Sequence, residues 1–122
     1  MGEFVIRQTA TGFKFDLKAG NGEVIATSEV YASKAACLKG VQSVCKSCNG
    51  QIEDHTIDPI VIVKHPKIEL FRDKSGQYRF RLKAGNAKVV ATSEGYASKA
   101  GCEKGIESIR KNAPQAVITE HA

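Results

Sequence analysis

The sequence has no tryptophan, one methionine, three prolines and no long apolar run. Its longest uninterrupted aliphatic stretch is Ile60-Val61-Ile62-Val63, whereas a membrane-spanning helix needs about 20 apolar residues. A transmembrane segment is therefore excluded. The first residues, Met1 to Arg7, lack the basic start and the apolar stretch of a secretory signal, so we expect a cytoplasmic protein.

The charge of the 122-residue chain is positive and unevenly distributed. Residues 1–57 hold six Lys/Arg and six Asp/Glu, while residues 58–122 hold twelve and seven, which gives the net charge of +5. A basic balance favours an anionic partner, such as nucleic acid or an acidic protein surface. The same charge is also typical of domains that it merely keeps soluble. With 42% hydrophobic residues, the composition is that of a globular protein.

The sequence contains an internal duplication with an offset of 65 residues. Residues 15–21, FDLKAGN, recur as residues 80–86, FRLKAGN. Between residues 15–46 and residues 80–111, 21 of 32 positions are identical. Self-similarity of this kind indicates one structural unit present twice.

Each copy predicts strands first. Apolar and polar residues alternate along residues 13–18 and again along 78–83, and a period of two indicates a strand with one buried face. Alternation at residues 4–6 and 68–70 predicts a preceding strand. Residues 24–27 and 89–92 predict a following strand, whose inward side the sequence leaves open.

A hairpin turn is predicted at Gly20-Asn21-Gly22, because Gly and Asn tolerate positive φ. The second copy has Ala87 in place of the last glycine. Because Ala disfavours positive φ, we expect Gly85 and Asn86 to take the demanding positions there.

A helix follows in each copy, after Ser33 and after Ser98, which are typical N-cap residues. Apolar and small residues recur on one face of each predicted helix: Cys37, Gly40, Val41, Val44 and Cys48, and then Cys102, Gly105, Ile106, Ile109 and Ala113. This spacing is typical of an amphipathic helix that covers a sheet. Glycine inside a helix costs about 1 kcal/mol relative to alanine, so Gly40 and Gly105 indicate close approach by the backbone of a strand or of the other helix.

Short apolar pieces around Ile52 and Val117-Ile118 predict a fourth strand in each copy. One copy alone is too small to bury a robust core. We therefore predict an α+β protein in which two β-β-β-α-β repeats, residues 1–57 and 68–122, share one antiparallel sheet about a pseudo-twofold axis. Both helices lie on one face, residues 58–67 connect the repeats, and the chain folds as one domain and is a monomer.

Three runs of the second copy resemble the YegP-like family of small bacterial proteins, whose function is uncharacterised. They are Phe80-x-Leu82-Lys83-Ala84-x-Asn86, Ala91-Thr92-Ser93-Glu94-x-Tyr96-x-Ser98-Lys99 and Gly105-Ile106-x-Ser108-Ile109-Arg110-Lys111-Asn112-Ala113. The resemblance implies a β-β-β-α-β unit present twice, in tandem or as a homodimer, and a single sheet with exchanged C-terminal strands. Ala87, Cys45 and Cys48 depart from the family pattern. The resemblance implies no catalytic or binding residues.

Cys45-x-x-Cys48 is the motif that most suggests chemistry. A structural zinc site needs four ligands, usually from two such pairs, and a redox dithiol needs a helix N-terminus to lower its pKa. This pair lies at the C-terminal end of the predicted helix, and the second copy replaces it with Arg110 and Ala113. Incidental cysteines are favoured over a thiol-based metal or redox site, and Cys37 and Cys102 are expected to be buried.

A polar cluster recurs in both copies: Ser28, Glu29, Tyr31, Ser33 and Lys34, and then Ser93, Glu94, Tyr96, Ser98 and Lys99. It could form two equivalent pockets, or equally a strand end, a turn, a ring packed on the sheet and a helix cap. No histidine recurs to act as base for a serine nucleophile. We expect no catalytic residue, no cofactor and no metal ion.

Arg79, Arg81 and Lys83 lie on the polar face of one predicted strand. If the helices cover only the other face, this stripe could contact phosphates. Sheets that bind single strands usually add exposed aromatic residues, which this face lacks. The interpretations are thus a non-catalytic binding or interaction module without cofactor, a non-specific nucleic-acid binder using these three residues, and a thiol-based protein using Cys45 and Cys48.

Overall fold

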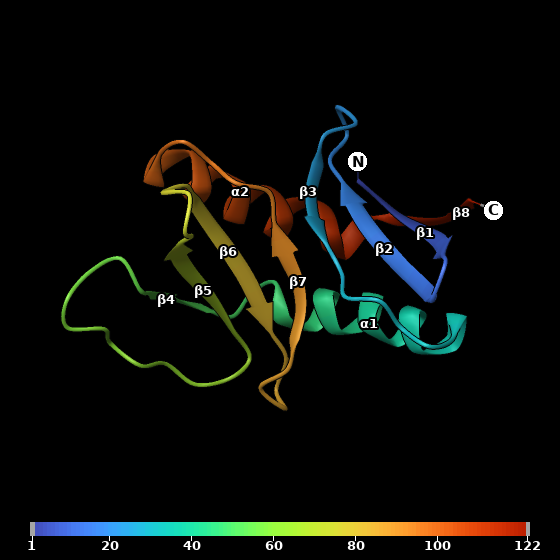
Figure 1. The fold of residues 1–122 in the computed structure, drawn as a ribbon, viewed down its shortest axis with the longest axis horizontal. Coiled ribbons are helices and arrows are strands. Elements are labelled where there is room, and N and C mark those ends of the chain that lie inside the picture. The colour runs from blue at the N-terminus through green and yellow to red at the C-terminus, as the bar shows by residue number, and fades with distance from the viewer. Residues whose placement is uncertain (1, 122) are drawn as a thin grey trace.

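The computed structural model describes residues 2–121, which form one sheet and two helices (Figure 1). The first repeat contains β1 (Glu3–Thr9), β2 (Gly12–Lys18), β3 (Val24–Thr27), α1 (Lys34–Ser47) and β4 (Gln51–Asp54). The second contains β5 (Lys67–Arg72), β6 (Tyr78–Lys83), β7 (Val89–Ser93), α2 (Lys99–Asn112), the short 3-10 helix η1 (Ala113–Gln115) and β8 (Val117–His121). The predicted α+β class and the repeated β-β-β-α-β order are confirmed.

The helices begin where the sequence predicts. The Ser33 hydroxyl accepts a hydrogen bond from the backbone N–H of Ala36, and the Ser98 hydroxyl accepts one from Gly101. Both helices lie on the far side of the sheet in Figure 1, α1 against β2, β6 and β7 and α2 against β3 and β6. Each helix therefore covers strands of both repeats. Within residues 2–121, no helix is long and apolar enough to cross a membrane.

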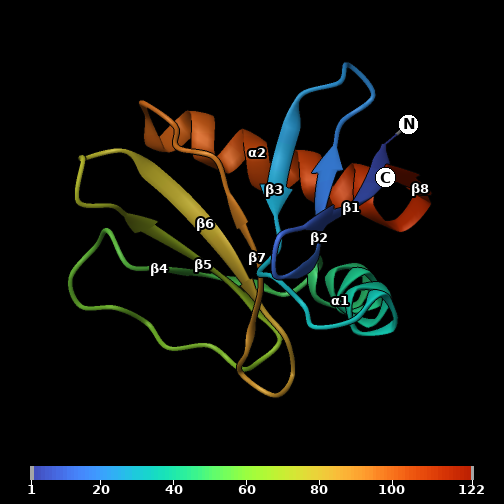
Figure 2. The same ribbon diagram turned by 45° about the vertical axis from the view of Figure 1, so that its right-hand side comes forward.

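The eight strands form a single sheet in the order β4-β5-β6-β7-β3-β2-β1-β8. At its centre β3 and β7 pair antiparallel, with Ala26 opposite Ser93 and Thr27 opposite Thr92. Figure 2 shows the twist of this sheet between its β5–β6 end and its β1–β2 end. No lobe of the molecule has a sheet of its own, because backbone hydrogen bonds join the two repeats at the centre.

The prediction that the sheet is wholly antiparallel is wrong, because both outer pairs are parallel. The last strand of the first repeat, β4, pairs with β5, and the last strand of the second, β8, pairs with β1. Neighbouring parallel strands need a connection of about a dozen residues. Residues 55–66, between β4 and β5, supply that length.

The inward side of the third strand depends on a bulge. Ala26 lies opposite Leu17, and Ala91 opposite Leu82, so both alanines face the helices with these core leucines. The register shifts just beyond each leucine. The residue before each alanine, Ile25 or Val90, is consequently also buried. This explains why the sequence alone did not distinguish the two sides of the strand.

The mid-helix glycines make room for a side chain, which corrects the prediction of close backbone approach. A Cβ added to Gly40 would lie 2.7 Å from Tyr31 Cζ and 3.1 Å from Phe15 Cε2. Gly105 stands in the same relation to Tyr96 and Phe80. The aromatic ring that precedes each helix therefore packs on the helix surface where a larger residue would exclude it.

The positive φ of the second hairpin turn falls on Ala87, contrary to the expectation that Gly85 and Asn86 would take it. The φ angle of Ala87 is 69°, and that of Gly22, its counterpart in the first repeat, is 85°. Left-handed backbone costs a residue with a Cβ roughly 1–2 kcal/mol. The turn keeps its conformation although the second repeat has lost the glycine that suits it.

This difference predicts opposite effects of two substitutions. Ala87→Gly should increase the free energy of unfolding by about 1 kcal/mol, and Gly22→Ala should decrease it by about the same amount. No atom lies within 4 Å of a Cβ added to Gly22, so the second change introduces strain without a clash. Chemical denaturation of wild type and both variants measures the two changes in the free energy of unfolding. A Gly22→Ala variant more stable than the wild type would contradict the positive φ at this turn position.

Candidate functional site

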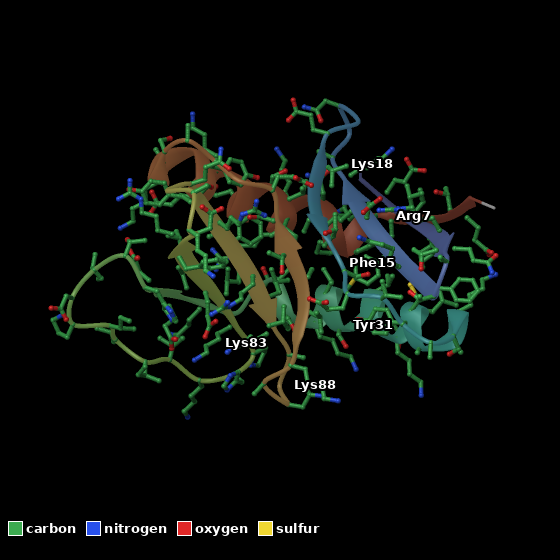
Figure 3. All side chains as sticks on the ribbon, in the orientation of Figure 1. Arg7, Phe15, Lys18, Tyr31, Lys83 and Lys88 are labelled. Atoms are coloured by element: carbon green, nitrogen blue, oxygen red, sulfur yellow. The ribbon has the colours of Figure 1, made fainter. Side chains whose placement is uncertain are left out.

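A groove lies between α1 and the turn that joins β6 to β7, and we call it the α1 groove. It consists of two adjoining cavities of about 330 and 350 Å³, which share Ser43, Ala84 and Asn86. One wall comes from the first repeat and the other from the second. Figure 3 shows Tyr31 beside α1 and Lys88 on the β6–β7 hairpin, the two sides of this groove.

A second groove, the α2 groove, lies between α2 and the turn that joins β2 to β3. Its two adjoining cavities, of about 200 and 770 Å³, share Ala19, Asn21, Lys104 and Ser108. It is the pseudo-twofold counterpart of the α1 groove. Of the recurring polar cluster, Glu29 and Tyr31 line the α1 groove and Tyr96 lines the α2 groove, whereas Ser33 and Ser98 cap the two helices. Two equivalent pockets formed by that cluster stay a prediction.

The two grooves present the same side chains. Residues separated by 65 positions line them in pairs: Lys39 and Lys104, Ser43 and Ser108, Lys46 and Lys111, Tyr31 and Tyr96, Asn86 and Asn21. The two lysines and the serine of each helix follow a spacing of four and then three residues, which places them on one helix face. The grooves differ in charge where Lys88 of the α1 groove corresponds to Glu23 of the α2 groove.

The groove lysines have no acidic partner. Within residues 2–121, no carboxylate lies within 4 Å of the ammonium group of Lys39, Lys46, Lys104 or Lys111. Seven other basic residues do have such partners: Arg7, Lys34, Lys67, Arg79, Arg81, Lys83 and Lys99. Of the eleven Lys/Arg residues without such a partner among residues 2–121, six line a groove: Lys39, Lys46, Lys88, Lys104, Arg110 and Lys111.

A tyrosine lines each groove, Tyr31 the α1 groove and Tyr96 the α2 groove. The Tyr31 ring stacks on Phe15 with ring centroids 6.4 Å apart, so the core fixes its position. Burial raises the pKa of the Tyr31 hydroxyl, and Cys37 and Glu29 raise it further. Burial likewise raises the pKa of Tyr96. Both hydroxyls therefore stay protonated near neutral pH and can donate or accept a hydrogen bond in the groove.

Sequence reasoning missed a buried charged cluster on the sheet face opposite the helices. Glu53, Lys67 and Glu69 are each at most 5% exposed. Lys67 Nζ lies 2.7 Å from Glu53 Oε2, and His55 Nε2 lies 2.6 Å from Glu53 Oε1. The backbone N–H of Val63 also donates to Glu53, at 2.9 Å. The cluster ties the connector and β4 to β5.

This cluster resembles a metal site in composition but not in charge. Ligand atoms of Glu53, His55 and Glu69 lie within 4.8 Å of one another. The carboxylates are already neutralised, because Lys67 contacts Glu53 while Arg81 and Lys83 contact Glu69 at 2.6 and 3.1 Å. The Lys67 ammonium thus supplies to Glu53 the positive charge that a metal ion would otherwise supply.

The basic stripe predicted to contact phosphates is paired with acidic residues. Arg79 Nε lies 2.7 Å from Asp73 Oδ2, and Arg81 and Lys83 share Glu69. All three lie on the face without helices, as predicted. Each would have to leave a carboxylate to bind a phosphate, so the stripe offers less free charge than its sequence indicates. Nucleic-acid binding by these residues stays a prediction.

The Cys45-x-x-Cys48 pair lies at the C-terminal end of α1, as predicted. Burial raises the pKa of both thiols, which disfavours the thiolate that metal binding and redox exchange require. Cys45 Sγ contacts the carbonyl oxygen of Ala113 at 3.5 Å. In the pseudo-equivalent position Arg110 donates to the carbonyl oxygens of Cys48 and Gly50, at 3.1 and 2.7 Å. A thiol function stays a prediction, whereas the buried Cys37 and Cys102 are confirmed.

Two comparisons with known sequences match most of the chain. The family model described as a domain of unknown function, DUF1508, matches residues 9–54 and again 73–120. A UPF0339 protein in the ptx operon 5′ region of Stutzerimonas stutzeri is 39% identical over 120 residues, which cover 98% of this chain and 96% of that protein. None of these descriptions names a reaction.

A shorter relative and a solved structure support the same division. A UPF0339 protein of Treponema denticola is 61% identical over 54 residues, which cover 44% of this chain and 93% of that protein, so it corresponds to little more than one repeat. The solution NMR structure of yegP from E. coli, a protein of unknown function, matches with a TM-score of 0.79 and 30% identity over 98% of this chain and 92% of that one. The predicted resemblance is thereby confirmed.

The charged cluster predicts how stability depends on pH. The Lys67 ammonium holds the pKa of Glu53 at about 2, against burial, which would raise it; Val63 and His55 also lower it. Because the folded pKa lies below the usual 4.5, the stability that ionised Glu53 contributes is fully present above pH 4.5 and is lost as pH falls towards 2. Glu53→Gln removes this contribution. Its unfolding free energy should therefore differ from that of the wild type most at neutral pH.

The measurement is the free energy of unfolding of wild type and Glu53→Gln between pH 7 and about pH 2. Asp16→Asn is a matched control, because Asp16 is a partly buried carboxylate that pairs with Arg7 on another strand pair. We expect the gap between wild type and Glu53→Gln to narrow as the solution is acidified. A gap that stays constant would show that Glu53 is not the titrating group.

Proposed function

We propose a function for a chain that belongs to the DUF1508 family, a domain of unknown function: it is a non-catalytic binding protein whose two pseudo-equivalent grooves each hold a ligand. One observation carries the proposal. The groove-lining residues Lys39, Ser43 and Lys46 recur at the same helix positions in the second repeat, although the repeats differ at 11 of 32 aligned positions. These side chains contribute nothing to the core.

The recurring serines at the end of the third strand support a binding rather than a catalytic role. The Ser28 hydroxyl accepts from the backbone N–H of Phe15 at 2.9 Å and donates to the carbonyl of Glu29 at 2.7 Å. Ser93 makes the same two bonds in the second repeat. Both hydroxyls are thus committed to the backbone and do not face a groove. The raised pKa of Tyr31 disfavours the tyrosinate that a Tyr–Lys pair would need as a base.

The walls of the grooves also indicate how many chains are needed to form the two sites. Each one has walls from both repeats, so a single chain completes both sites. We therefore propose a cytoplasmic monomer, without cofactor, that carries two ligands. Residues 1–57 and 68–122 act as the repeats and 58–67 as their connector. Nucleic-acid binding through Arg79, Arg81 and Lys83 and thiol chemistry through Cys45 and Cys48 are the alternatives.

A ligand screen by NMR tests the proposal. The probe is a library of small carboxylates, phosphates, amines and neutral fragments added to ¹⁵N-labelled protein. We expect hits to shift backbone amides on both walls of a groove. Ser43→Trp fills the α1 groove at the residue its two cavities share. It should abolish hits in that groove and leave the α2 groove unchanged, and Ser108→Trp should do the reverse.

The control is Lys74→Trp, which adds the same ring at an exposed turn that lines neither groove. It should leave all hits unchanged. Hits that map to the sheet face of Arg79, Arg81 and Lys83 would transfer the proposal to the nucleic-acid alternative. A screen in which no compound shifts groove amides, or in which both tryptophan variants keep their hits, would reject it.

A further inference from the structure

We infer that the ligand is an elongated organic anion and that the α1 groove is its stronger site, an inference that rests on the proposed function. The sequence shows only a general excess of positive charge, which could have lain anywhere on the surface. Among residues 2–121, the structure places five of the nine lysines without an acidic partner in the two grooves, which also contain hydrogen-bond donors. This combination is what a water-exposed site needs in order to select a negative group.

The lysine spacing indicates an extended ligand. Lys39 and Lys46 are seven residues apart on α1, so their Cα atoms are separated by about 10 Å along the helix axis. Lys39 lines the cavity that contains Tyr31, here called the inner cavity, and Lys46 lines the adjoining outer cavity. A ligand with a negative group at each end would use both lysines and the serine between them.

The wall between the lysines is partly apolar, which indicates that the ligand is organic. Val89, Val90 and Ala36 line the inner cavity together with Tyr31. Val89 and Val90 come from the second repeat, on the opposite side from Lys39. An aliphatic or aromatic middle section would bury apolar area against these residues. An inorganic polyanion would leave them without a partner.

Charge distinguishes the two grooves. The α1 groove contains Lys39, Lys46 and Lys88 against one acidic residue, Glu29, for a balance of three minus one, or +2. The α2 groove contains three basic residues against two acidic ones, for a balance of +1: Lys104, Arg110, Lys111, Glu23 and Glu107. Arg110 is moreover engaged with the carbonyl oxygens of Cys48 and Gly50. An anion should therefore prefer the α1 groove.

Three probes of the same chain length separate charge from apolar contact. Suberate has a carboxylate at each end, octanoate has one, and octanediol has none. In low salt we expect suberate to bind the α1 groove at least about threefold more tightly than octanoate, and octanediol most weakly, because suberate can form an ion pair at each end, octanoate at one end and octanediol at neither. Amide shifts in ¹⁵N-labelled protein give the dissociation constant of each probe and show which groove it occupies. Added salt should weaken suberate most.

A charge exchange between the grooves tests the asymmetry. Lys88 and Glu23 are exposed residues of equivalent turns, so the double variant Lys88→Glu/Glu23→Lys keeps the net charge and the turn geometry. It should move the stronger suberate site from the α1 groove to the α2 groove. Lys39→Ala/Lys46→Ala should weaken the α1 site at least about fivefold. The matched control Lys64→Ala/Lys74→Ala removes the same charge outside both grooves and should change affinity less than about twofold.

The outcomes separate this inference from the proposed function. Equal affinity for suberate and octanediol in low salt, or no suberate binding in either groove, would overturn the inference that the ligand is an anion. Fragment hits in the grooves would still support the binding function. An exchange variant that retains the preference for the α1 groove would overturn the assignment of the stronger site. Loss of suberate binding in the Lys64→Ala/Lys74→Ala control would show that net charge, not groove geometry, attracts the anion.

Discussion

Backbone pairing between the repeats, at the β3–β7 centre and at the two outer parallel pairs, is the constraint on which the rest of the structure depends. A half-sized unit with one helix and four strands exposes too much apolar surface to be stable alone. By pairing β8 with β1 and β4 with β5, each repeat contributes its last strand to the other half of the sheet. The helices then cover strands of both repeats, and residues of both repeats form one hydrophobic core.

The grooves are a consequence of this pairing. Because α1 extends over β6 and β7, the β6–β7 turn of the second repeat lies against a helix of the first, and the reciprocal contact forms the α2 groove. The ring of Tyr31 reaches the groove because Gly40 has no side chain to block it. Duplication thus gives two sites in one chain. Divergence at single positions, such as Lys88 against Glu23, can then make them unequal without disturbing the shared fold.

Much of this fold could be predicted from the sequence because the repeated pattern constrains it twice. The alternation of Phe15 and Leu17 correctly predicted strand β2, and the N-cap Ser33 correctly predicted the start of α1, because periodicity and capping are local properties. Strand direction at the edges could not be predicted, because it depends on the path of the connector. Ala87 was misjudged because tertiary pairing of the hairpin overrides the preference of one residue. The grooves required knowing which turn meets which helix. The sequence indicated the grooves only through Lys39, Ser43 and Lys46, which recur in the second copy although they do not belong to the hydrophobic core.

The most direct test of the shared sheet is to cut the connector and ask whether the halves separate. A protease site placed at Val61, which is 68% exposed, allows cleavage of the folded protein without touching a described strand. If the repeats complete each other, the two fragments should co-elute at the size of the uncut chain, retain its amide spectrum and separate only in denaturant. Two fragments that part under native conditions, each with a folded spectrum, would contradict the account.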